Sequence, residues 1–162
     1  MKRLFSVLVL FCMIGTGLSA CSSAKTAELP SLTVGSTIEA SVGAHSWNVK
    51  QGLGNWMGQE ASVVFPLDYP DDYPALSIPQ DGVIALEWDI PPDSYTVSYW
   101  KEAVWNDGME AEMTEAQEND LGFQMPEEDA PAIVTVRAVW EKQVLCSSYG
   151  DVEYIFKIVQ GS

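Results

Sequence analysis

Few side chains in this chain could carry catalysis. His45 is the only histidine, so a nucleophilic site of the serine–histidine or cysteine–histidine type would need it. Cys146 is a conceivable partner, but a lone histidine is more often structural. The chain has no G-x-S-x-G, H-E-x-x-H, C-x-x-C, P-loop or G-x-G-x-x-G pattern. We therefore predict a protein that is not an enzyme and has no cofactor.

Acidic side chains are the second candidate for chemistry. The stretch 102–129 holds ten acids and no basic residue, and a smaller group consists of Asp68, Asp71 and Asp72. Calcium is bound by several oxygen ligands, so either group could form a calcium site. Neither has the spacing of an EF-hand loop, and the pattern favours a solvated loop over a calcium site for the long stretch. Within it, Met109, Met113 and Ala116 fall at helical spacing and are compatible with a short helix, and 106–108 is compatible with the turn of a hairpin.

Aromatic side chains in loops are the third candidate, because exposed rings recognise sugars and peptides. The glycine-rich segment 52–58 predicts a loop around Trp56, and strand ends or loops are expected at the other positions. The candidates for ligand binding are Trp47, Trp56, Tyr69, Tyr73 and Trp105. The alternative is that these rings cover an end of the hydrophobic core.

The N-terminus has the layout of a secretory signal: Lys2 and Arg3, then an apolar run over 4–14 that is too short to span a bilayer. The segment Leu18-Ser19-Ala20-Cys21 resembles the lipobox of bacterial lipoproteins. The resemblance implies cleavage after Ala20, acylation of Cys21 and anchoring of the extracytoplasmic chain to the lipid bilayer. Ser22 takes the place of the aspartate that marks inner-membrane retention in enterobacterial lipoproteins, so the outer membrane is expected where a cell has one.

The net charge is −15, from 8 basic and 23 acidic residues, which excludes the basic surface of a nucleic-acid-binding protein. Removal of 1–20 leaves six basic residues and all 23 acids, and the charge becomes −17. An anionic membrane repels such a domain, so the lipid must hold it. We divide the chain into a signal peptide (1–20), a lipidated cysteine with its tether (21–31) and a folded domain (32–162).

The domain shows the two-residue alternation of β-strands. The strongest segments are 83–90, 94–101, 133–140 and 152–158, with a turn predicted at 148–151; weaker ones are 37–42, 46–50, 61–65 and 75–78. This pattern predicts an all-β antiparallel sandwich of about seven to nine strands.

One stretch resembles a known family. Trp88-Asp-Ile-Pro-Pro-Asp-Ser-Tyr95-Thr-Val97-Ser-Tyr99 is similar to strands B and C of fibronectin type III domains, and 135–139 to their strand F. The resemblance covers 83–159 and implies an immunoglobulin-like sandwich, although the tyrosine typical of strand F is missing. The whole chain also resembles small sandwich lipoproteins of Gram-positive bacteria.

Such a fold does not define an activity. The anchor and the loop aromatics favour an extracytoplasmic module that binds a protein, a peptide or a cell-wall glycan. The alternative is a calcium-binding or structural envelope protein that uses 102–129.

Overall fold

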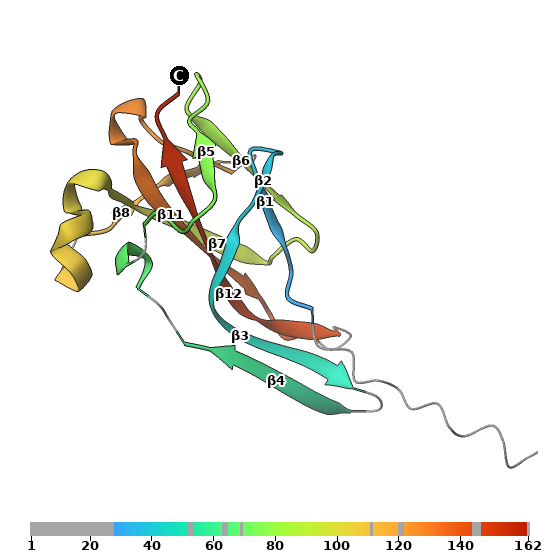
Figure 1. The fold of residues 1–162 in the computed structure, drawn as a ribbon. Coiled ribbons are helices and arrows are strands. Elements are labelled where there is room, and N and C mark those ends of the chain that lie inside the picture. The colour runs from blue at the N-terminus through green and yellow to red at the C-terminus, as the bar shows by residue number, and fades with distance from the viewer. Residues whose placement is uncertain are drawn as a thin grey trace, which may run out of the picture.

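The computed structural model describes residues 28–51, 54–62, 65–68, 70–110, 112–119, 122–143 and 147–161. Strands dominate these residues, and the helical segments are short 3₁₀-helices (Figure 1). The predicted all-β antiparallel sandwich is confirmed. The described part of the chain contains twelve strands rather than seven to nine, because several are pieces of only two or three residues.

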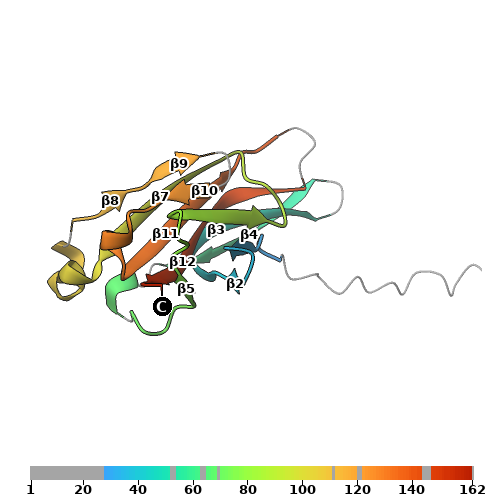
Figure 2. The ribbon, with the colours of Figure 1, turned by 90° about the horizontal axis from the view of Figure 1, so that it is seen from above.

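Two sheets form the sandwich (Figure 2). The smaller has the order β2 (Ile38–Glu39), β1 (Leu32–Val34), β6 (Val83–Trp88), β10 (Gly122–Gln124) and β9 (Gln117–Asn119). The larger has the order β4 (Asn55–Ala61), β3 (Ser41–Gln51), β12 (Ser148–Val159), β11 (Ala132–Trp140), β7 (Ser94–Lys101) and β8 (Thr114–Glu115). A further strand, β5 (Ala75–Ser77), pairs with the end of β12 in the parallel sense.

The main core lies between the sheets and follows the alternation seen in the sequence. The predicted inward positions of β12 are all fully buried: Val152, Tyr154, Phe156 and Ile158. The indole of Trp88 packs edge-on against Trp140 and Tyr154, with ring centroids 5.9 and 5.4 Å apart. Large apolar side chains at every second position therefore hold the two layers together.

A second, smaller core covers the outer face of the larger sheet. It consists of Leu67, Trp100, Ile133 and Ile155. The 3₁₀-helices η1 (Pro66–Asp68) and η2 (Glu102–Glu110) lie over this face. Trp100 points away from the main core, and this cover is what buries it. The acidic stretch forms a 3₁₀-helix over 102–110, so the hairpin at 106–108 is wrong. The predicted short helix is only partly correct, because Thr114 and Glu115 belong to β8.

One predicted turn and the predicted loop around Trp56 are wrong. Residues 148–151 belong to β12, and Trp56 lies in β4 rather than in a loop. Glycine at 150 is typical of a turn, but in the structure it allows β12 and β3 to approach each other closely. A Cβ there would lie 2.0 Å from the carbonyl oxygen of Ser46, and its φ is 151°. Of the predicted strand 61–65, Ala61 is the last residue of β4, 62 and 65 lie outside any strand, and 63–64 lie outside the described residues.

The described chain begins at the end of the sandwich to which the tip of the β3–β4 hairpin also points (Figures 1 and 2). Leu29 packs against the main core, and the backbone N–H of Ser31 donates to Asp89. Contact with the domain therefore starts before residue 32, the expected end of the tether. No helix among the described residues is long and apolar enough to cross a membrane.

Candidate functional site

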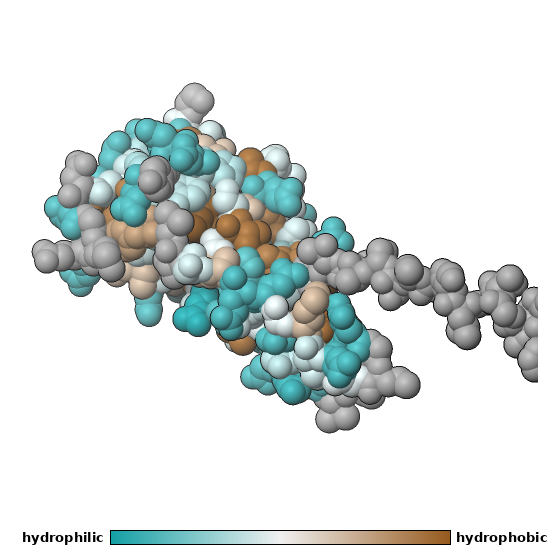
Figure 3. Space-filling view, turned by 60° about the horizontal axis from the view of Figure 1, so that its bottom comes forward, coloured by the Kyte–Doolittle hydropathy of each residue, from teal (hydrophilic) through white to brown (hydrophobic). Residues whose placement is uncertain are grey.

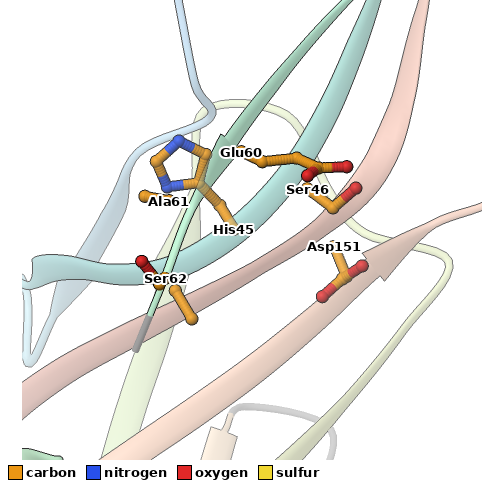
Figure 4. A pocket seen from close by; sticks show the side chains of 7 residues that line it. His45, Ser46, Glu60, Ala61, Ser62 and Asp151 are labelled. Carbon is orange, nitrogen blue, oxygen red and sulfur yellow. The ribbon is translucent and has the colours of Figure 1, made fainter. Parts of the chain in front are cut away.

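A row of three side chains crosses the outer face of the larger sheet. Asp151 of β12 lies directly opposite Ser46 of β3, and Ser46 lies opposite Glu60 of β4. Directly opposed side chains have Cβ atoms about 5 Å apart. Two carboxylates therefore flank one small hydroxyl, and with Ala44, Ala61 and Ser62 they line a shallow hollow of about 500 Å³ (Figure 4).

The charges of this row are only partly compensated. Arg137 donates to Asp151 at 3.3 Å. Glu60 has no ion pair among the described residues, and its side chain is exposed. None of the described residues that line the hollow is a lysine or an arginine. The hollow is therefore an acceptor-rich, negatively charged depression.

A second hollow adjoins the first and shares Ala61 and Ser62 with it. Its other lining residues are Val42, Gly43, Asp72, Tyr73 and Ile155. Val42 is 45% exposed, which is unusual for a large apolar side chain here. Figure 3 shows apolar surface in the middle of this face of the molecule. The combined depression, which we call the acidic groove, thus has an acidic half and an apolar half.

Glu153 lies beneath the groove, where the pairing of β12 with β3 is interrupted by a bulge. Its Oε1 is buried and has no hydrogen-bond partner among the described residues. Burial raises the pKa of this carboxyl, although the charge of Arg137 and the backbone N–H of Ala44 act in the opposite direction. A Cβ on Gly43 would lie 2.9 Å from Oε1, so glycine leaves room for the carboxylate.

His45 contributes to the lining but does not form a catalytic arrangement. It lies opposite Val152, whereas its neighbour Ser46 lies opposite Asp151, so the imidazole and the serine hydroxyl leave opposite faces of the strand (Figure 4). Its Nδ1 lies 3.3 Å from the carbonyl oxygen of Gly43. No hydrogen bond joins the ring to a serine or a carboxylate in the described part of the chain.

The prediction that Trp47 lies at a loop or strand end is wrong, and its burial removes the exposed ring that a ligand would need. Trp47 lies within β3, is 1% exposed and packs edge-on against Trp140 at 5.2 Å. Trp47 and Val49 are two residues apart in β3, so both side chains point to its inner face. The short predicted strand 46–50 did not reveal that this face is the core side. Its buried Nε1 has no partner among the described residues.

Trp56 is half-buried on the outer face, where it packs against Tyr149 with ring centroids 4.8 Å apart. The ammonium of Lys142 lies 5.3 Å from the Trp56 ring and 5.1 Å from the Tyr149 ring. Sequence reasoning missed Tyr149 and Lys142. The alternation of 148–158 could have revealed Tyr149, but Gly150 was interpreted as a turn.

The side chains of Trp105 and Tyr73 are half-buried and pack against the smaller core. The Trp105 Nε1 donates to the carbonyl oxygen of Trp100 at 3.0 Å, and Lys157 lies 5.0 Å above its ring. Tyr73 also borders the acidic groove. The structure therefore does not bring the four described aromatic candidates together. Tyr69 and Cys21 lie outside the described residues.

The candidate calcium ligands receive no support. No group of three or more histidine, cysteine, aspartate or glutamate side chains in the described ranges could hold a metal ion. Asp71 pairs with Lys157 at 3.1 Å, which places a cation where a calcium ligand was considered. Asp68 and Asp72 are exposed.

Comparisons with protein families, with curated proteins and with solved structures found no match to this chain. Arguments about function therefore rest on its own residues.

Proposed function

We propose that this chain is a lipid-anchored, extracytoplasmic module without catalytic activity that binds a cationic segment of a polypeptide in the acidic groove. The observation that carries the proposal is the row Asp151–Ser46–Glu60, in which two carboxylates flank a small residue. An ammonium or guanidinium group that lies over Ser46 would meet both carboxylates.

The apolar half of the groove favours a polypeptide. A side chain next to the cation could rest against Val42 and Ile155, which border the second hollow. Glycan sites typically present an aromatic face to the sugar. Among the described residues, no tryptophan lines either hollow, and Tyr73 is the only tyrosine or phenylalanine there.

The anchor is supported by the lipobox resemblance of 18–21 and by the position of the first strand. Because β1 begins at Leu32, about ten residues separate the strand from Cys21. Labelled fatty acid fed to cells should be incorporated into the wild-type chain and not into Cys21→Ser. Equal incorporation into both would contradict the anchor.

Binding can be tested on the chain from Ser22 onward, which contains every described residue. On an array of random peptides, we expect retention of sequences in which lysine or arginine neighbours an apolar residue. Glu60→Lys should weaken the binding of a selected peptide at least about tenfold, because it places a cation in the groove. Acetylation of the peptide lysine should have a similar effect.

The matched control is Glu118→Lys, which makes the same charge change at an exposed position of β9 in the other sheet. Equal weakening by both variants would show that only net charge matters and would overturn the groove as the site. Binding to a glycan array with no binding to peptides would overturn the choice of a polypeptide.

A further inference from the structure

This protein has few basic side chains, and only some of those that the structure describes form ion pairs. Of the five that the structure describes, Lys101, Arg137 and Lys157 form ion pairs with Asp129, Asp151 and Asp71. Lys50 and Lys142 form no ion pair with any described residue, and both are exposed. These two lysines are therefore the described cations that remain available for another contact.

Both unpaired lysines lie beside the same aromatic ring. Lys50 of β3 is directly opposite Trp56 of β4, and Lys142 approaches Trp56 and Tyr149 from the connection after β11. Both rings are half-buried. We call Lys50, Trp56, Lys142 and Tyr149 the aromatic-lysine patch.

The patch lies at the end of the domain where the described chain begins (Figures 1 and 2). The backbone N–H of Lys50 donates to Ser147 at 2.8 Å, which joins the hairpin to the connection after β11. That connection contacts Asp93 through Gln143, and Asp93 belongs to the loop that begins with Asp89, the partner of Ser31. The chain start and the patch thus belong to one end of the sandwich.

The distance to the lipid is short. Leu29 already packs on the domain, so seven residues, 22–28, separate Cys21 from the folded part. Seven extended residues span at most about 25 Å. An acylated Cys21 therefore keeps this end within a few nanometres of the bilayer, at a high effective concentration.

We propose that the aromatic-lysine patch docks on the headgroup region of the membrane that holds the lipid of Cys21. The inference rests on the anchor of the proposed function. Tryptophan and tyrosine favour the membrane–water interface, where an apolar ring and a polar N–H or O–H are both solvated. Lysine ammonium groups are attracted to lipid phosphates.

Docking at this end orients the domain. Glu141 precedes Lys142 and reduces the local positive charge, so the rings must supply much of the attraction. The 3₁₀-helix η2, with its acidic surroundings, lies at the opposite end in both ribbon views and is directed away from the anionic surface.

The experiment uses the chain from Ser22 onward with an N-terminal histidine tag in place of Cys21, held on vesicles by nickel-chelating lipid. The vesicles contain phosphatidylcholine, phosphatidylglycerol and a lipid that carries a nitroxide in its headgroup region. We expect tryptophan fluorescence to be quenched on tethering. Trp56→Phe should lose most of this quenching, and Trp105→Phe, at the far end, should retain it.

The charge contribution is tested with Lys50→Gln/Lys142→Gln, which should weaken the quenching. Its matched control, Gln80→Glu/Gln124→Glu, makes the same change in net charge at exposed positions away from the patch. Unquenched wild-type protein, or equal quenching in Trp56→Phe and wild type, would overturn the docking. Because the tag replaces acylation, this result is independent of fatty-acid labelling and of peptide binding, which test the proposed function.

Discussion

The hydroxyl of Tyr154 donates a hydrogen bond of 2.7 Å to the carbonyl oxygen of Pro30. Tyr154 is fully buried in the middle of β12, and Pro30 immediately precedes the first strand. The bond fastens the start of the domain to its core. Burial and the negative charge of Asp89 raise the pKa of this hydroxyl, so it remains a donor through the physiological range.

Tyr154→Phe should lower the free energy of unfolding by about 1–2 kcal/mol, because the Pro30 carbonyl loses a buried donor. Urea denaturation measures the loss, and hydrogen exchange should become faster at 31–33. Tyr73→Phe is the control, since the Tyr73 hydroxyl has no hydrogen bond among the described residues. Equal losses in the two variants would show that the bond to Pro30 contributes nothing.

Asp129 should contribute stability that depends on pH. Burial raises the pKa of this carboxyl, but hydrogen bonds from Lys101 and Tyr99 outweigh that effect and lower it overall. The Tyr99 hydroxyl lies 2.5 Å from Oδ2. The stabilisation is therefore complete above the ordinary carboxyl pKa of about 4 and disappears as pH falls through the lower folded value.

Asp129→Asn should cost about 2 kcal/mol at pH 7, a figure reduced from that of a fully buried pair because Lys101 is half-exposed. The difference between variant and wild type should shrink toward pH 2. Chemical denaturation across this range measures it. If the difference in free energy of unfolding between variant and wild type stays constant with pH, Asp129 does not have the lowered pKa on which the prediction depends.

The contribution of Glu153 to stability should depend on pH in the opposite direction. Its raised pKa means that ionisation opposes folding, so its cost is absent below the ordinary glutamate pKa and complete above the folded value. Glu153→Gln should raise the free energy of unfolding at pH 7 by at most about 1 kcal/mol, because Arg137 loses one favourable charge but keeps Asp151. The gain should vanish in acid. Destabilisation at pH 7 would show that Arg137 dominates.

Gly150→Ala should destabilise the domain by at least about 3 kcal/mol or prevent folding. Its Cβ would collide with the backbone of Ser46, which cannot retreat without breaking the pairing of β3 with β12. Gly58→Ala is the control: its nearest contact is a side-chain oxygen of Asn48 at 3.3 Å. Thermal unfolding of both variants provides the comparison, and similar melting temperatures would refute the close-approach argument.

Much of the fold could be predicted because alternation is a local property. The segment 94–101 coincides with β7, and the inward residues of 152–158 are all buried. The lipidation of Cys21 and the fibronectin type III resemblance of 83–159 stay predictions. The β3–β4 hairpin and β5 precede that stretch and extend the larger sheet.

The sequence by itself determined the all-β class, the acidity and the strongest strands, because two-residue periodicity and charge can be recognised from neighbouring residues alone. Only the tertiary structure decided that Trp47 is core, that Gly150 allows two strands to approach closely, and that Glu60, Ser46 and Asp151 form one row. The physical reason is register. Which residues face each other depends on which distant strands pair and where a bulge shifts them, and no local pattern records that choice.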